Sequence, residues 1–109
     1  MTDTQFAACV RECAAYDDLD AYVSDMSLST IWGDDDTTEA TARFVLRSIY
    51  TAVNRTPKEI VAASGLSQAA FAERYCIPKR TVEDWCRGVA KCPLYTRLLL
   101  QRAEGLLQV

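Results

Sequence analysis

The 109-residue chain contains no histidine and has only four glycines and three prolines. Without histidine, the sequence excludes a Ser-His-Asp triad, a Cys-His pair and any metal site with an imidazole ligand. No apolar run approaches the roughly 18 residues that a membrane span needs, and the first residues lack the pattern of a signal peptide. We therefore expect a cytoplasmic protein that is not an enzyme and has no cofactor, metal or membrane contact.

Cysteine is present five times, an odd number that argues against a disulfide framework. Cys9 and Cys13 are spaced as i, i+4, and Cys86 and Cys92 flank a predicted turn. These spacings match no common zinc-binding pairing twice over. The sequence therefore predicts buried, reduced cysteines within a helical core.

Charge divides the chain into two unequal parts. The net charge is −3, which by itself argues against a nucleic-acid binder. Residues 1–40 carry ten acidic residues and one basic residue, a net charge of −9, whereas residues 41–109 carry eleven basic and five acidic residues, a net charge of +6. This asymmetry favours an anionic partner for the second part alone.

Hydrophobic periodicity predicts helices throughout, and no segment alternates with period two for long enough to be a strand. Apolar residues recur every three or four positions in one unbroken stripe from Phe6 to Met26, which predicts an N-terminal helix. Asp36 resembles an N-cap, with Glu39 at the third helical position, so a second helix is expected to run to about Asn54.

A fuller start signal follows at Thr56, with Pro57 at the first helical position and Glu59 placed to reach back to the cap. This third helix is expected to end near Gly65, where a left-handed residue would stop it.

The next helix start and stop signals predict two short helices. Ser67 caps a helix through Tyr75, and Pro78 opens a second helix that Gly88 closes, after a connection of three or four residues. Such a pair describes a helix-turn-helix, whose second helix can enter the major groove of DNA. Beyond it, a final leucine-rich helix is expected to run from Pro93 toward residue 107.

The stretch 67–88, SQAAFAERYCIPKRTVEDWCRG, resembles the phage-repressor/Cro-like (xenobiotic-response-element type) helix-turn-helix family. Gln68 matches its helix-opening glutamine, Ala72 its small residue at the helix crossing, and Gly88 its closing glycine. One departure is Cys76, which stands at the turn position where the family has glycine; a positive φ there would be costly. The matches to core positions are Phe71, Tyr75, Ile77, Val82 and Trp85.

The resemblance implies an all-α fold: a compact, lambda-repressor-like bundle of about five to six helices with an extra N-terminal helix. We expect residues 1–36 to form an acidic N-terminal helical segment, and residues 37–109 to form one compact helix-turn-helix DNA-binding domain.

The resemblance also places the site. The candidates for contact with base edges are Lys79, Arg80, Thr81 and Asp84. The candidates for contact with phosphates are Ser67, Gln68, Arg87 and Lys91. Arg80 is the better candidate for a base contact, because its guanidinium group can donate to guanine O6 and N7 together. Asp84 could accept from cytosine or orient Arg80 one turn earlier, and the sequence favours neither role.

Two functions remain open. The first is a sequence-specific, double-stranded DNA-binding transcriptional regulator, a repressor acting as a homodimer, with the helix 78–87 in the major groove. The second is an antitoxin-like adaptor that uses the helix-turn-helix as a scaffold and binds a protein partner through residues 1–36. The dimer could form through the N-terminal segment or through the final helix.

Overall fold

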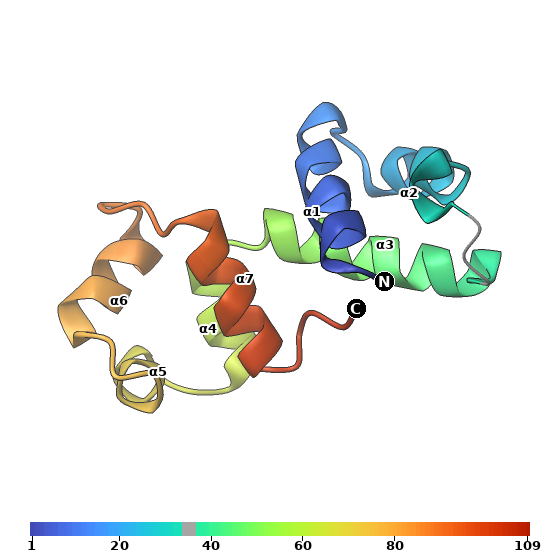
Figure 1. Ribbon diagram of the computed structural model, residues 1–109. Helices are drawn as coiled ribbons and strands as arrows, with labels where there is room; N and C mark the ends of the chain where they lie inside the picture. Colours follow the sequence, from blue (N-terminus) through green and yellow to red (C-terminus); the bar gives the residue numbers. More distant parts are fainter. Residues whose placement is uncertain (34–36) are drawn as a thin grey trace. The chain divides into compact units, whose positions relative to one another are not determined.

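The computed structural model describes residues 1–33 and 37–109, and every regular element in these ranges is helical (Figure 1). The expected all-α class is confirmed, with seven α-helices in the described residues where five to six were expected. None of these helices is both long and apolar enough to cross a membrane. The α-helices are α1 (Asp3–Glu12), α2 (Leu19–Ser27), α3 (Glu39–Asn54), α4 (Pro57–Ser64), α5 (Gln68–Arg74), α6 (Lys79–Arg87) and α7 (Leu94–Ala103), and two 3-10 turns cover Cys13–Ala15 and Thr30–Trp32.

The chain forms two compact units. Unit 1 contains residues 1–54 and 106–109, and unit 2 contains residues 55–105. The division therefore falls after Asn54, whereas the sequence suggested a boundary after residue 36. The physical reason is the apolar face of α3, which buries Ala42, Leu46 and Ile49 in the part of unit 1 where α3 packs against α1 and α2.

The N-terminal segment is two helices, not the single helix that the apolar stripe predicted. The chain is extended at Tyr16 (φ −127°, ψ 137°), and α2 begins after Asp18. The Asp18 carboxylate caps α2 by accepting from the Ala21 N–H at 3.2 Å. Apolar spacing alone did not reveal this break, because the stripe continues in phase across it.

The core of unit 1 is organised around Tyr22, which is fully buried. Its hydroxyl donates to the Cys9 carbonyl oxygen at 2.8 Å, and its ring lies 5.5 Å from that of Tyr16 and 4.9 Å from that of Tyr50. The Trp32 indole N–H donates to the Met26 carbonyl oxygen at 2.9 Å. Each of these two buried polar groups therefore has a partner, which keeps the burial of large aromatic side chains favourable.

Two details of unit 1 concern the ends of helices. Asp36, the expected N-cap of the second helix, lies outside the described residues; the Thr38 hydroxyl accepts from the Thr41 N–H at 3.2 Å at the start of α3. At the other end of the chain, α7 stops at Ala103 and not near residue 107. The following segment completes unit 1: Leu107 is buried, and the Gln108 N–H donates to Ser48 Oγ at 3.0 Å.

In unit 2, the predicted start and end of α4 are confirmed. The Thr56 hydroxyl accepts from the Glu59 N–H at 3.2 Å, and the Glu59 carboxylate accepts from the Thr56 N–H at 3.0 Å. Pro57 occupies the first turn, and Gly65 ends the helix in the left-handed conformation (φ 74°). Each of these signals acts on residues within four positions of its own, which is why the sequence alone could reveal them.

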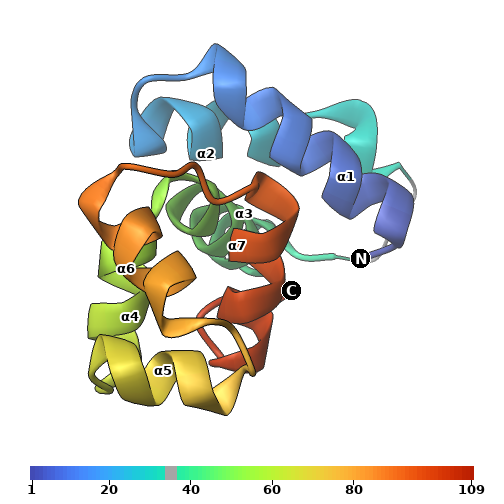
Figure 2. The ribbon, with the colours of Figure 1, turned by 90° about the vertical axis from the view of Figure 1, so that its left-hand side faces the viewer.

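The core of unit 2 lies among α4, α5, α6 and α7 (Figure 2). Gln101 is a fully buried polar residue of unit 2, and its side chain accepts a 2.8 Å hydrogen bond from Arg55 Nη1. The buried apolar residues are Ile60, Val61, Phe71, Ala72, Val82 and Leu100, with Leu66, Tyr75, Ile77, Trp85 and Cys86 packed against them.

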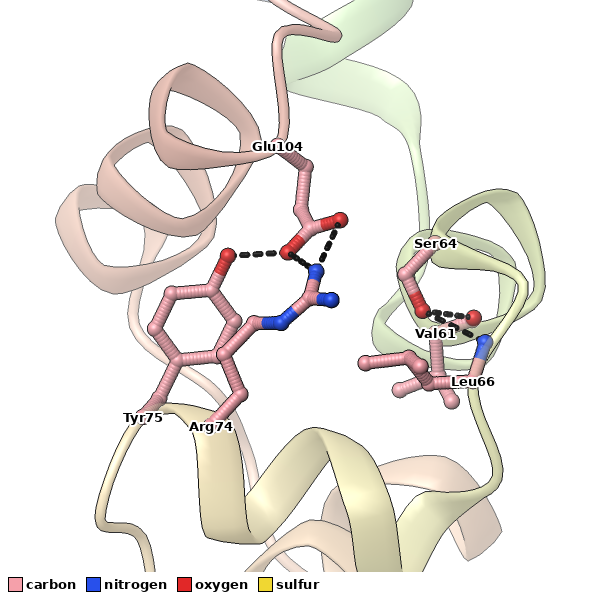
Figure 3. Close-up of polar contacts among 6 residues, drawn as sticks. All are labelled: Val61, Ser64, Leu66, Arg74, Tyr75 and Glu104. Atoms are coloured by element: carbon pink, nitrogen blue, oxygen red, sulfur yellow. Dashed lines mark hydrogen bonds and ion pairs between the residues drawn. The ribbon is translucent and has the colours of Figure 1, made fainter.

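Glu104, just after α7, fixes the end of α5 (Figure 3). Arg74 Nη1 donates to both carboxylate oxygens, at 3.1 and 2.8 Å, and the Tyr75 hydroxyl donates to one of them. The Glu104 side chain is only 7% exposed. The hydrogen bonds from Tyr75 and Arg74 hold the pKa of this carboxyl below its ordinary value.

A Glu104→Gln substitution should therefore make unit 2 less stable at neutral pH, by about 1–3 kcal/mol, because a charge-assisted pair is lost. A lowered pKa in the folded state means that the carboxylate stabilises the fold above the pKa of the unfolded chain. This contribution is lost as the pH falls through the lower folded pKa. The wild type should thus lose more stability than the variant between about pH 6 and pH 3.

Urea unfolding followed by circular dichroism at several pH values measures this difference. Glu73→Gln, an exposed substitution on α5, is the matched control and should leave the pH profile unchanged. Parallel pH profiles for the wild type and Glu104→Gln would contradict the role of Glu104.

Candidate nucleic-acid interface

The α5–α6 pair is joined by the four residues 75–78. Ser67 caps α5, as the sequence predicted, by accepting from the Ala70 N–H at 3.1 Å. The connection is closed by two backbone hydrogen bonds, from the Cys76 N–H to the Glu73 carbonyl oxygen (3.2 Å) and from the Ile77 N–H to the Ala72 carbonyl oxygen (2.9 Å). These bonds fix where α6 begins relative to α5.

Cys76 adopts the left-handed conformation in this connection, with φ 54°. It is the single non-glycine residue with positive φ in the described ranges. Cys76 stands where the resemblance predicts a glycine, and the backbone there has the conformation that glycine favours. Its side chain is exposed, which differs from the expectation that the cysteines are buried.

The inner faces of the two helices are apolar. Phe71 and Ala72 of α5 and Val82 of α6 are buried, and Trp85 packs against the same core. The core positions predicted from the sequence are therefore confirmed, and Trp85 contributes to packing, as its helical spacing indicated. Burial of this face leaves the opposite side of α6 to carry its charged residues.

The structure places the predicted base-contacting residues on α6. Lys79 and Arg80, in its first turn, are exposed, and Thr81 and Asp84 are partly buried. Among the predicted phosphate-contacting residues, Ser67, Arg87 and Lys91 are exposed and Gln68 is partly buried. Of these eight residues, Arg80, Asp84 and Arg87 are brought into direct contact. Among the residues that the structure describes, the other five candidates make no side-chain hydrogen bond or ion pair to this cluster.

Asp84 joins the two arginines through one oxygen atom. Arg80 Nε donates to Asp84 Oδ1 at 3.1 Å, and Arg87 Nη2 donates to the same oxygen at 2.7 Å. The hydrogen bond from Arg87, together with the one from Arg80, holds the pKa of the Asp84 carboxyl below its ordinary value. The cluster has a net charge of +1 and lies along one side of α6.

The start of α6 is electrostatically unusual. Pro78 precedes it and offers no side-chain cap, and Lys79 and Arg80 stand in the first turn. The first turn of a helix carries partial positive charge from its unpaired N–H groups, so cations there do not favour helix stability. The same arrangement suits the approach of an anion. Unit 2 adds to this potential, because its sequence carries nine basic and five acidic residues, a net charge of +4.

Two residues that bear on this surface were missed by sequence reasoning. Glu104 fixes the end of α5 from a position 30 residues away, and no local pattern indicates that contact. Lys58 on α4 is exposed and lies close enough to Cys86 for its charge to oppose the rise in the thiol pKa that burial causes. Lys58 therefore adds a cation near Cys86.

Other kinds of site find little support in the described ranges. No group of three or more metal-ligating side chains gathers there. A cavity in unit 2 has a volume of about 10 Å³ and is lined by apolar side chains and by Cys86 and Cys92. It has room for about one water molecule. Comparison with family models, curated proteins and solved structures finds no match for this chain.

The strain at Cys76 yields a stability prediction. Cys76→Gly should raise the free energy of unfolding by about 0.5–1 kcal/mol, because relief of the left-handed strain outweighs the greater entropy of glycine in the unfolded chain. Cys76→Ala removes the thiol and keeps Cβ, so it serves as the matched control and should give no such gain. Chemical denaturation of both variants measures the effect; equal stabilities would contradict it.

Proposed function

We propose that this chain is a sequence-specific, double-stranded DNA-binding transcriptional regulator. In this proposal α5, residues 75–78 and α6 form a helix-turn-helix of the repressor/Cro-like kind, and α6 enters the major groove. The observation that carries the proposal is the exposed, cationic side of α6, with Lys79 and Arg80 in its first turn and Arg87 in its last.

The dimensions of α6 support this placement. Its nine residues span about 14 Å at 1.5 Å per residue, and the major groove, about 12 Å wide, admits a helix. An arginine that reaches a base edge can donate to guanine O6 and N7 together, and in this proposal Gln68, at the start of α5, contacts a phosphate. The short connection and the bracing by Glu104 would keep these two contacts in a fixed relation.

We further propose that the regulator is a repressor that acts as a homodimer on two related half-sites, because one recognition helix contacts few base pairs. The surface favoured for self-association is on α7, where Tyr95 and Leu99 are 70% and 64% exposed and lie four residues apart on one helical face. Unit 1 also exposes large apolar side chains, Leu28 and Phe44, but they come from different segments.

The adaptor alternative is favoured by a different observation. Unit 1 has its own core, and its sequence carries ten acidic and three basic residues, a net charge of −7. A surface of that charge suits a basic protein partner. In this alternative the acidic unit binds the partner, and the α5–α6 pair is a scaffold.

Duplex binding separates the two functions. Selection from a random duplex pool should enrich a preferred site, and binding should weaken steeply with salt because phosphate contacts release counterions. A chain that binds no duplex at about 50–100 mM salt, where phosphate contacts still count, would refute the regulator and leave the adaptor.

Three alanine substitutions test the contacts. Arg80→Ala should weaken binding to the preferred site by about 1–3 kcal/mol and relax one base position. Gln68→Ala should weaken preferred and random duplexes by a similar factor, because a phosphate contact carries no sequence information. Lys79→Ala should lower the salt slope by about one unit if Lys79 contacts a phosphate. Unchanged binding by both Arg80→Ala and Gln68→Ala would exclude this interface.

A pair of charge insertions tests the dimer. Leu99→Asp should shift the chain toward monomer in sedimentation at micromolar concentration, because a carboxylate would be buried in an apolar contact. Leu28→Asp is the control, since it introduces the same charge at an exposed leucine in unit 1 and should leave self-association intact. A strictly monomeric wild type, both free and on DNA, would remove the dimer from the proposal.

A further inference from the structure

We infer that Asp84 is a positioning residue that sets the base preference of Arg80, an inference that rests on the proposed function. In this role Asp84 does not read a base. Its carboxylate holds the Arg80 side chain along α6, so that the outer end of the guanidinium group is aimed away from the helix. Sequence alone left two roles open for Asp84, and the contacts made by its oxygen distinguish them.

The contact from Arg80 to Asp84 uses Nε, the inner nitrogen of the guanidinium group. Arg80 bonds Asp84 through Nε, at 3.1 Å, and its two Nη groups make no hydrogen bond to any residue in the described ranges. A guanidinium group held through Nε keeps both Nη donors available at its far end, and end-on donation by those groups fits O6 and N7 of guanine. The Arg80 side chain is 78% exposed, so this far end is open to a ligand.

Arg87 has a different geometry and a different role. It bonds Asp84 through Nη2, at 2.7 Å, so one of its end groups is already occupied. Because Arg87 is held at its end by the shorter contact, it keeps Asp84 charged and in place for Arg80. The backbone of Asp84 is fixed as well, since its carbonyl oxygen accepts from the N–H groups of Val89 (2.9 Å) and Ala90 (3.2 Å).

Burial argues against a direct base contact by Asp84. Its side chain is 22% exposed, against 78% for Arg80 and 58% for Arg87, and the bonds from both arginines converge on Oδ1. A carboxylate that is enclosed between two cations on its own helix serves to orient them. The negative charge of Asp84 also opposes attraction to phosphates, but phosphates are the same in every duplex, so this effect weakens binding to preferred and random duplexes alike.

The test measures binding of the full chain to two probes, its preferred duplex and a random duplex of equal length. Asp84→Ala should reduce the ratio of the two affinities by about threefold to tenfold, because an untethered Arg80 pays more entropy to reach one base. Binding to the random duplex should stay at least as tight as for the wild type. Glu83→Ala removes the same charge from the neighbouring residue of α6, so it should leave the ratio unchanged.

A double-mutant cycle shows whether Asp84 acts through Arg80. In an Arg80→Ala background, Asp84→Ala should have no effect on the ratio. An equal loss of preference with and without Arg80 would overturn the positioning role, and so would a wild-type ratio in Asp84→Ala. Thermal unfolding of each variant shows that the fold is kept, which is expected because the carbonyl of residue 84 remains.

These outcomes separate the inference from the proposed function. If the wild type binds no duplex, or binds all duplexes equally, the regulator itself is refuted and this inference falls with it. If the wild type shows a preference that Asp84→Ala retains in full, the inference alone fails.

Discussion

The packing of α5 on α6 is the constraint on which the structure of unit 2 depends. Phe71 and Val82 are buried almost completely where the helices meet, and each such side chain contributes about 1.5–3 kcal/mol when it leaves water. Ala72 is buried in the same core. Because these residues fix which side of α6 faces inward, they also decide which side carries charge to the solvent.

Local signals in the sequence predicted much of unit 2, since capping interactions connect residues only three or four positions apart. Thr56, Ser67, Gly65 and Gly88 each mark a helix end by a mechanism that neighbouring residues supply. The apolar positions of the α5–α6 pair were predicted from the resemblance to the repressor/Cro-like family, and helical spacing supported the same assignment for Trp85. The candidate cations of α6 also came from that resemblance, and the structure shows only that Lys79, Arg80 and Arg87 are exposed.

Long-range packing explains what the sequence did not reveal. Nothing near α3 indicates that its apolar face packs against α1 and α2, so the division of the chain was expected earlier than the structure has it. The contact of Glu104 with Arg74 and Tyr75 joins segments about 30 residues apart and is equally invisible to local patterns. The break at Asp18 was hidden differently: the apolar stripe stays in phase across it, and periodicity cannot distinguish one helix from two that continue each other's pattern.

The positions of Leu107 and Gln108 in the sequence determine which unit can finish folding first during synthesis. Unit 2 is contained within residues 55–105, so a ribosome has delivered all of it before the last core side chain of unit 1 emerges. The hydrogen bond between Gln108 and Ser48 closes a loop across 60 residues, and closing a flexible loop of that length has an entropic cost. If unit 2 is already compact, most of that loop is no longer flexible chain. Residues 106–109 would then pack onto the rest of unit 1 after the sequence between them, unit 2, has already folded.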